Sequence, residues 1–335
     1  MNRVTAHPLF HAPDYPASQP LDSRQMLAIH DLNARLANGS LTSETVPCLC
    51  GGADFDLVAS FDRYRVAQDT VLCRHCGLML SRPRMSPATL SWFYGSDAYR
   101  RIYGGGNLLP HTGEKFLANA ANARLYTLLG QHLDMTEIGS VAEIGCGAGW
   151  KLWEFHQAGK RVLGCDYSPE LTAAGREAGL DIRQGTAGQA FTDEKADLVI
   201  LSHVVEHFSD PAAEVIAISD RLSAQFLYIE VPNVDFFCSD FLQSAHLYYF
   251  SPATLIHYMA KAGLAAVTVI PRGCHFGVIF KRGEAPPAPD LSAEYRRVVG
   301  IVRRYERRET VKTWLRRAGI FPVAQWVASV LRAIR

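Results

Sequence analysis

The feature that most constrains this chain is a glycine-rich turn between two short apolar segments. Segment 141–144 leads into Gly145, Gly147 and Gly149, and Asp166 ends the next apolar segment. Glycines at alternate positions let a backbone turn sharply and approach a ligand, and a carboxylate after the following strand can accept hydrogen bonds from both hydroxyls of a ribose. The pattern predicts a strand–turn–helix–strand unit that binds an adenosine-containing cofactor.

The residue ahead of the turn indicates which cofactor this is. Dinucleotide-binding turns carry Gly-x-Gly-x-x-Gly and direct a helix N-terminus at a pyrophosphate. Here the third glycine comes one residue early, and Glu143 would repel a pyrophosphate. A carboxylate suits the positively charged amino-acid end of S-adenosylmethionine (SAM). We therefore expect SAM; an NAD-dependent dehydrogenase and a turn without a ligand are the weaker alternatives.

Three stretches, 143–149, 164–170 and 197–211, resemble the motifs of class I SAM-dependent methyltransferases, and the similarity covers roughly residues 114–282. The resemblance implies a backbone turn beside the methionine portion, a ribose-binding acid and an aromatic side chain against the adenine. It also implies polar residues near the sulfonium. One position departs from the family's pattern, because Thr186 stands where many relatives carry an Asp that contacts the adenine amine, and its hydroxyl can replace that carboxylate as acceptor. The positions that it assigns to the cofactor are Glu143, Gly145, Cys146, Gly147, Gly149, Asp166, Tyr167, Thr186, Ser202 and His203.

Short apolar segments alternate with helical patterns through this region, which predicts an α/β fold with a parallel sheet covered on both faces. We expect a Rossmann-like seven-stranded sheet whose last strand is antiparallel, as in the class that the motifs resemble. The expected strands are 141–144, 161–165, 181–183, 197–201, 226–231, 264–270 and 275–281. The expected helices are 22–38, 114–129, 149–158, 169–179, one from 211, and 252–263, whereas 1–21 is expected to be disordered.

Four of the eight cysteines are clustered as Cys48-x-Cys50 and Cys73-x-x-Cys76, and glycines follow both pairs. Zinc in structural sites prefers four tetrahedral thiolates, and trailing glycines let backbone amides turn towards the sulfurs. The pattern predicts a zinc ribbon. The first pair is one residue shorter than usual, so His75 is an alternative fourth ligand. Small buried residues in a β module are the alternative without metal.

A cysteine module ahead of this domain narrows the resemblance. The segments 73–84, 93–94 and 246–255 are similar to the zinc-containing methyltransferases of deoxysugar and polysaccharide biosynthesis, which extends the similarity to roughly residues 45–282. Many of those enzymes act on nucleotide-linked sugars. The resemblance therefore implies a sugar acceptor, linked to a nucleotide or a lipid.

Histidine is the natural base for methyl transfer to a hydroxyl or a carbon acid, because its pKa lies near 6.5. His246 is the first candidate. The sugar C-methyltransferases carry a Glu-His pair here, but this chain has Ala245, so we expect transfer to oxygen with carbon as the alternative. His203 and His207 form a second group with Glu206, for which we expect a structural or substrate-orienting role, or a second metal.

The C-terminal segment is strongly basic. Residues 291–335 hold eleven Lys or Arg and three Glu, a net charge of +8 in a chain whose total is +1. Basic residues beside Trp326 and aliphatic residues fit an interfacial helix on anionic lipid, so 316–335 is a candidate for peripheral membrane contact. Packing on the core is the alternative. We recognise no RNA-binding module, and the rest of the chain is acidic, which argues against a nucleic-acid partner.

The whole chain divides into four parts on these grounds. They are an N-terminal extension and helix (1–45), a zinc-binding module and connector (46–110), a SAM-dependent methyltransferase domain (111–284), and a linker with a basic helical tail (285–335). Met1 to Pro20 has no apolar core, and we expect a cytoplasmic protein. A non-catalytic protein that binds zinc or SAM is the alternative of another class.

Overall fold

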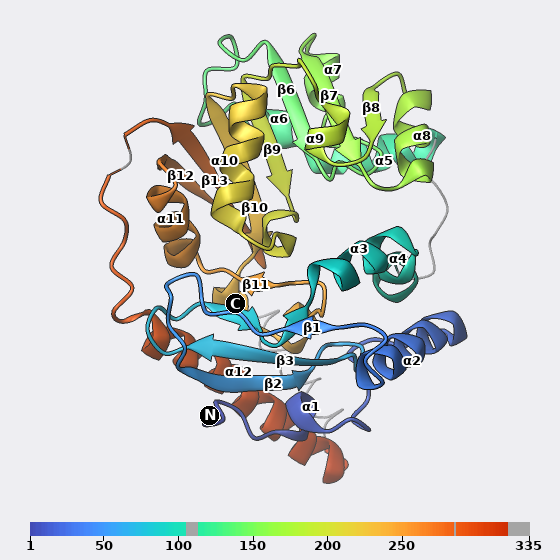
Figure 1. The fold of residues 1–335 in the computed structure, drawn as a ribbon, viewed down its shortest axis with the longest axis vertical. Coiled ribbons are helices and arrows are strands. Elements are labelled where there is room, and N and C mark those ends of the chain that lie inside the picture. Colours follow the sequence, from blue (N-terminus) through green and yellow to red (C-terminus); the bar gives the residue numbers. More distant parts are fainter. Residues whose placement is uncertain (105–112, 285, 321–335) are drawn as a thin grey trace.

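A computed structural model describes residues 1–104, 113–284 and 286–320, which form a seven-stranded sheet, a four-stranded sheet and a two-stranded pair. Figure 1 shows the two larger sheets one above the other, with α3 (Pro87–Gly95) and α4 (Ala98–Tyr103) between them on one side. The larger sheet lies in the upper half of the view and carries the glycine turn. The smaller sheet lies below and carries the cysteines. None of the described helices is long and apolar enough to cross a bilayer.

The larger sheet has seven strands in the order β12-β13-β10-β9-β6-β7-β8. The five strands from β10 to β8 are parallel, and β13 inserts antiparallel between β10 and β12. This confirms the predicted Rossmann-like sheet with seven strands. The strands are β6 (Ser140–Ile144), β7 (Arg161–Asp166), β8 (Asp181–Gln184), β9 (Leu198–Ser202), β10 (Phe226–Pro232), β12 (Leu264–Arg272) and β13 (His275–Arg282).

Three helices beside this sheet begin where the sequence predicts, because Ser168, Asp210 and Ser251 each cap a helix whose first residue is proline. The cap side chains accept hydrogen bonds from backbone N–H groups that the first helical turn leaves free. The helices of this part are α5 (Gly113–Ala123), α6 (Leu125–Leu129), α7 (Trp153–Gln157), α8 (Pro169–Glu177), α9 (Ala187–Ala190), η1 (Val205–His207), α10 (Pro211–Leu222), η2 (Val234–Phe236), η3 (Ser239–Phe241) and α11 (Pro252–Lys261).

The smaller sheet has the order β11-β4-β3-β2, and its β11 comes from a segment far along the chain, beyond most of the larger sheet. This pairing brings residues near His246 onto the cysteine module. The strands are β2 (Phe55–Phe61), β3 (Ala67–Cys73), β4 (Met79–Ser81) and β11 (Tyr248–Tyr249), with a separate pair β1 (Ser43–Glu44) and β5 (Arg84–Met85). The helices of this half are α1 (Pro8–His11), α2 (Ser23–Ala37), α3 (Pro87–Gly95), α4 (Ala98–Tyr103) and α12 (Glu294–Arg317).

The long helix α12 packs beneath the smaller sheet, as Figure 1 shows. Its Val298 and Val302 are buried in one apolar cluster with Val58 of β2 and Leu72 of β3. The sequence predicts a basic helical tail, and this much of it covers the sheet. Residues 321–335, including Trp326, lie outside the described residues.

Three local predictions were wrong. Residues 1–21 are not disordered, because Phe10 is fully buried and Arg3 pairs with Leu57 as a β-bridge. Few apolar residues are enough to order this segment, since they fill one face of the smaller sheet. The helix predicted over 114–129 breaks at Arg124, whose φ is 47°. The helix predicted over 149–158 begins only at Trp153.

Candidate functional site

The glycine turn follows β6 at the carboxyl edge of the larger sheet, as predicted. Gly145, Gly147 and Gly149 have φ values of 66°, 57° and 78°, in the left-handed region that favours glycine. A Cβ on Gly145 would lie 2.7 Å from a methyl group of Val204. Gly147 has no such close neighbour, so its backbone is open to a ligand. The neighbouring Cys146 thiol is buried and donates a hydrogen bond to the Gly147 carbonyl at 3.5 Å.

Asp166 ends β7, and its carboxylate is hydrogen-bonded to the glycine turn. Its Oδ2 accepts a hydrogen bond from the Gly147 amide at 2.9 Å, and its Oδ1 accepts one from the Ser168 amide at 2.8 Å. A carboxylate has about four lone-pair sites, so it can still accept hydrogen bonds from hydroxyl groups. Tyr167 beside it is 59% exposed and stacks on Tyr94 of α3 with ring centroids 6.3 Å apart.

Glu143 provides a test of whether this site fits SAM. Its side chain is fully buried, and its Oε2 has no hydrogen-bond partner among the described residues. Burial raises the pKa of Glu143 to about 7, although Lys151 lies 3.4 Å from Oε1. An unpaired buried oxygen is costly, and a ligand that donates hydrogen bonds would satisfy it. The charged amino group of SAM is such a donor, so the residues fit the cofactor.

Thr186 and Ser202 differ in how their hydroxyl groups are used. Thr186 caps α9, and its hydroxyl accepts a hydrogen bond from the Gln189 amide at 3.2 Å. Ser202 ends β9, and its hydroxyl is buried without a partner among the described residues. The Ser202 hydroxyl is therefore the one with hydrogen-bonding capacity left for a ligand.

A buried carboxylate lies among three histidines where β9 ends. Glu206 is 1% exposed, and its Oε1 is 3.4 Å from His203 Nδ1 and 4.0 Å from His246 Nε2. The His207 and His246 rings lie 5.0 Å apart. Burial alone would raise the pKa of Glu206, but contact with the histidines, His203 first, lowers it below its ordinary value, which favours the ionised carboxylate. Neither oxygen of Glu206 has a hydrogen-bond partner among the described residues.

His246 is neutral in this environment. Burial, together with His207, lowers the pKa of His246 to about 3, and its Nδ1 has no partner among the described residues. The His207 Nδ1 lies 2.9 Å from the Ala245 carbonyl and 3.0 Å from the Tyr94 hydroxyl. Since a carbonyl only accepts, the proton of His207 is on Nδ1.

The structure changes the argument drawn from Ala245. That residue is fully buried and has no carboxylate, but Glu206 places one 4.0 Å from the His246 ring. Glu206 of η1 therefore lies near His246 without a hydrogen bond to it, because the His246 Nε2 accepts one from the Gln243 amide at 3.0 Å. The carboxylate nearest to this histidine comes from η1 and not from the residue before it.

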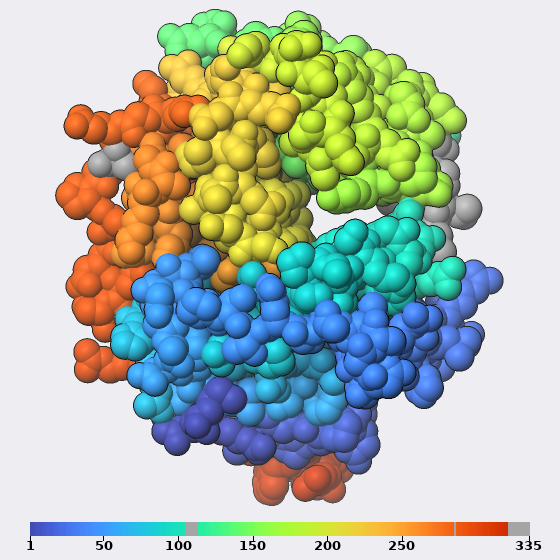
Figure 2. Space-filling view, in the orientation of Figure 1, coloured from blue at the N-terminus to red at the C-terminus, as the bar shows by residue number. Residues whose placement is uncertain are grey.

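Three neighbours of these side chains were not predicted. Glu230 of β10 and His275 of β13 lie beside His203, and Tyr94 of α3 contacts His207. Glu230 is inside an apolar strand, and His275 is a single histidine after a glycine and a cysteine, so no local pattern marks either. Figure 2 shows a hollow between the surface of α3 and α4 and the surface of the seven-stranded part, and Tyr94 and His207 meet where these two parts come together.

The four predicted zinc ligands converge. The Sγ atoms of Cys48, Cys50, Cys73 and Cys76 all lie within 4.8 Å of one another. Two of the separations are 3.5 Å and 3.6 Å, close to the edge of about 3.8 Å expected for a tetrahedral zinc thiolate site.

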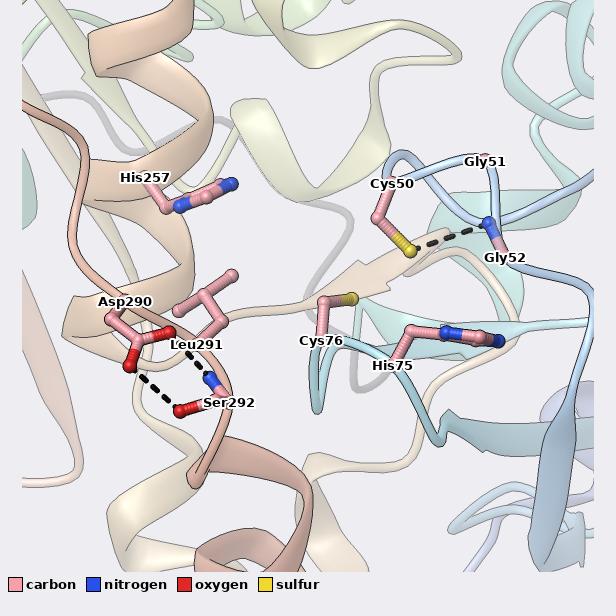
Figure 3. A pocket seen from close by; sticks show the side chains of 9 residues that line it. All are labelled: Cys50, Gly51, Gly52, His75, Cys76, His257, Asp290, Leu291 and Ser292. Atoms are coloured by element: carbon pink, nitrogen blue, oxygen red, sulfur yellow. Dashed lines mark hydrogen bonds between the residues drawn. The ribbon is translucent and has the colours of Figure 1, made fainter.

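The short spacing of the first pair is accommodated by its turn. Gly51 has a φ of 80°, and the Gly52 amide donates a hydrogen bond to Cys50 Sγ at 3.3 Å. Cys48 therefore reaches the cluster, and the alternative ligand His75 is turned away, with Nε2 3.7 Å from Asp54. Cys50 and Cys76 line a cavity of about 540 Å³. Figure 3 shows His257 of α11 across this cavity from them.

Comparisons with known proteins agree with this geometry. Residues 114–269 match the family model described as a methyltransferase domain. The C-methyltransferase NovU of Streptomyces niveus is 27% identical over 245 residues, which is 66% of this chain and 52% of NovU. The chain thus spans about half the length of this curated relative.

Solved structures also match, at low similarity. A SAM-dependent methyltransferase from Mesorhizobium loti is 15% identical with a TM-score of 0.39, and the match covers 48% of this chain and 98% of that one. Magnesium protoporphyrin IX methyltransferase from Synechocystis PCC 6803, with bound S-adenosylhomocysteine (SAH), is 15% identical with a TM-score of 0.39, covering 58% and 99%. Such scores carry no argument about function. The family model matches residues 114–269 as a methyltransferase domain, and the glycine turn in this region has a geometry that suits SAM.

Proposed function

We propose that this chain transfers a methyl group from SAM to a sugar, with His246 as the base. The observation that carries the proposal is the buried His246–Glu206 pair, 4.0 Å apart at the sheet edge that also carries the glycine turn. The sugar acceptor is inferred from the resemblance of the cysteine module and of segment 246–255 to sugar methyltransferases. Bound SAM would supply a methyl group on a good leaving group, so the chain has mainly to position two reactants and move one proton.

The residues have separate tasks in this reaction. Asp166 and the unpaired Glu143 oxygen would hold the cofactor by its ribose and its amino group. The acceptor oxygen forms a bond to the methyl carbon as the sulfur–carbon bond breaks, and the sulfur keeps that electron pair. The hydroxyl proton passes to His246. Glu206 would stabilise the imidazolium that results, because an ionised carboxylate nearby favours the charged ring.

Transfer to a sugar carbon is the second candidate, and Glu206 is the observation that favours it. A carbon acid next to a keto group needs a base that first removes the proton, and Glu206 raises the pKa of His246 against the lowering by burial and by His207. The similarity to a relative named as a C-methyltransferase agrees with this. In this version His246 takes the proton from carbon and the carbanion attacks the methyl group.

One experiment tests both candidates. The protein is incubated with methyl-labelled SAM and a panel of nucleotide-linked and lipid-linked sugars, and the products are identified by mass spectrometry. Hydrogen–deuterium exchange at the carbon beside a keto group, without SAM, would identify carbon transfer. If calorimetry detects binding of neither SAM nor SAH, the enzymatic proposal is wrong.

We also propose that the four cysteines hold a structural zinc ion. The four sulfurs converge, their spacing suits tetrahedral thiolates, and Gly51 and Gly77 have the positive φ values of turning knuckles. Such an ion would stabilise the smaller sheet, which β11 links to the segment carrying His246. Metal analysis of the purified protein tests this directly.

The outer face of α12 is a candidate for contact with anionic lipid. Arg303, Arg304 and Arg307 are exposed, whereas Glu306 is turned inward and accepts a hydrogen bond from the His7 amide at 2.8 Å. Trp314 on the same helix is 63% exposed. Cations beside an exposed Trp suit an anionic surface. The test is flotation of the protein with phosphatidylglycerol vesicles. The controls are phosphatidylcholine vesicles and an Arg303→Glu/Arg307→Glu variant. Equal flotation in all three cases would disprove the contact with anionic lipid.

A further inference from the structure

Two histidines and a glutamate from three adjacent strands meet at the carboxyl edge of the larger sheet. His203 follows β9, Glu230 is in β10 and His275 begins β13, and their ligand atoms all lie within 4.8 Å of one another. His203 Nε2 is 4.0 Å from Glu230 Oε1, and the two imidazole rings are edge to face with centroids 4.5 Å apart. This is the ligand set of a site with two histidines and one carboxylate on one face of an ion.

The orientation of His203 suits a metal ligand. Its Nδ1 faces Glu206 Oε1 at 3.4 Å, while its Nε2 faces Glu230. The nearby carboxylate favours the tautomer with the proton on Nδ1, and this tautomer leaves the Nε2 lone pair for an ion. The backbone holds the ring here at a cost, because His203 has a φ of 58°, which residues other than glycine seldom adopt.

The other two side chains, His275 and Glu230, each have an atom that is available to bind an ion. The His275 Nδ1 is buried and has no hydrogen-bond partner among the described residues. Glu230 is 6% exposed, and the Tyr228 hydroxyl donates a hydrogen bond to its Oε2 at 2.8 Å, which leaves Oε1 facing His203. A buried carboxylate oriented by a hydrogen bond is a typical second support for an ion.

We propose that His203, Glu230 and His275 bind a divalent cation such as Mn²⁺, Fe²⁺ or Mg²⁺. Imidazole nitrogen and carboxylate oxygen suit these ions, and three protein ligands leave positions open for oxygen atoms of a second molecule. The role of this ion rests on the proposed function: it would bind an oxygen of the sugar acceptor, and the hydroxyl would then lose its proton to His246 more readily. The set is distinct from the four cysteines, whose thiolates suit zinc.

Arg272 sets a limit on the affinity. Its Nε lies 3.6 Å from Glu230 Oε1, so an ion would share that carboxylate with a guanidinium group. The repulsion between the two cations makes the site weaker than one with free ligands. The ligand atoms must also move closer, because bonds of about 2.0–2.2 Å bring neighbouring ligands to about 3 Å.

The test is titration of the full chain, with its cysteines loaded with zinc, by Mn²⁺ alone. Free Mn²⁺ gives a six-line electron paramagnetic resonance signal that disappears on binding, and Mn²⁺ has little preference for thiolates. We expect one Mn²⁺ site that His275→Ala and Glu230→Gln each weaken by about 10–100-fold. Arg272→Gln should strengthen binding. The exposed His132 is the matched control, and His132→Ala should bind as the original chain does.

Several results would overturn the proposal. One is that the original chain binds no Mn²⁺, and another is that His275→Ala and Glu230→Gln both bind Mn²⁺ as tightly as the original chain. Loss of binding in His246→Asn but not in His275→Ala would assign the ion to Glu206, His207 and His246, which are also close enough together to hold one. Calorimetry with SAH on each variant checks the fold and separates the two proposals, because SAH binding without Mn²⁺ binding refutes only the cation.

Discussion

The four-cysteine cluster and the histidine–glutamate edge both gather metal-ligating side chains, but they are built differently. The cysteines come from two short turns, at 48–50 and 73–76, each of which positions its own pair. The histidines and glutamates come from β9, η1, β10, the loop before β11, and β13. A ligand set within two turns can be recognised from spacing alone, whereas one assembled from five elements depends on how the sheet is ordered.

The two clusters also differ in what holds them without an ion. At the cysteines the hydrogen-bond partners are other cysteines and a backbone amide, although three of the four side chains are also buried in the apolar core. At the edge, the Tyr228 hydroxyl donates a hydrogen bond to Glu230, and Glu206 lies 3.4 Å from His203 Nδ1. We therefore expect the cysteine cluster to depend on metal for its fold, and the edge to fold without one. The predictions below test that contrast.

The largest effect is expected from Cys73→Ser. A structural zinc site contributes about 10 kcal/mol or more to folding, and a hydroxyl is a poor zinc ligand. Zinc content should fall to background and the smaller sheet should unfold, as measured by metal analysis and thermal melting. Cys274→Ser, at an exposed thiol outside the cluster, is the control and should change neither quantity.

If Cys73→Ser melts like the original chain, the cysteines are simply small buried residues and the contrast between the clusters disappears. Removal of zinc from the original chain by a chelator should reproduce the effect of the substitution. A chelator that leaves the melting temperature unchanged would also mean that the cluster folds without an ion.

His246→Asn should affect turnover and not the fold. Loss of a general base lowers kcat by about 10²–10⁴-fold, and Glu206→Gln should lower it by about 10–100-fold, since the charge that stabilises the imidazolium is lost. Turnover is measured with the acceptor found in the sugar panel, and SAH affinity should be unchanged. His257, whose Nδ1 is bonded to the Pro289 carbonyl, is the matched histidine, and His257→Asn should keep full turnover.

If kcat is unchanged in His246→Asn, His246 is not the general base. An unchanged kcat in Glu206→Gln alone would leave His246 as the base but make its carboxylate partner structural. Carbon transfer depends more on the pair, so the Glu206 result also helps to distinguish the two acceptors.

Asp166→Asn tests the cofactor site. This site comes from two successive strands, so it is less local than the cysteine cluster and more local than the histidine–glutamate edge. The charge-assisted hydrogen bonds of a carboxylate contribute about 1.5–3 kcal/mol, so the Kd for SAH should rise by about 10–100-fold. Calorimetry measures it, with Asp193→Asn at an exposed position as the control. If the Kd for SAH is unchanged in Asp166→Asn, the Asp166 carboxylate only stabilises the turn at Gly147 and does not contact the cofactor.

The smallest effect is expected from Glu143→Gln. Burial raises the pKa of Glu143 to about 7 from an ordinary value of 4.5, so the folded chain holds that proton more tightly than the unfolded chain. The stability from this group is full below pH 4.5 and is lost as the pH rises through 7. Glutamine should therefore raise the melting temperature of the ligand-free protein at about pH 8 by a few degrees, with little gain at about pH 5, while SAH affinity falls.

Melting curves at both pH values, with Glu177→Gln as an exposed control, measure the Glu143 effect. A gain in melting temperature that is the same at the acidic and the alkaline pH would show that ionisation of Glu143 is not its cause. A gain without any loss of SAH affinity would separate Glu143 from the cofactor.

Much of the fold could be predicted because its signals are local. Ser168, Asp210 and Ser251 cap their helices before a proline, and short apolar segments mark each strand of the larger sheet. The failures have a common cause. Nothing near Phe10 indicates the apolar cluster that it fills, and nothing near Arg124 indicates why the helix must turn there, because both depend on distant partners.

The sequence by itself determined the glycine turn with Glu143 and Asp166, and the four cysteines, because short-range geometry alone places those groups. Tertiary structure alone decided what surrounds His246. Sheet order and the path of η1 bring the Glu206 carboxylate to within 4.0 Å of its ring, across a sequence separation of forty residues, and strand register brings Glu230 and His275 beside His203. Contacts of that range carry no local pattern, since they exist only after the strands pair.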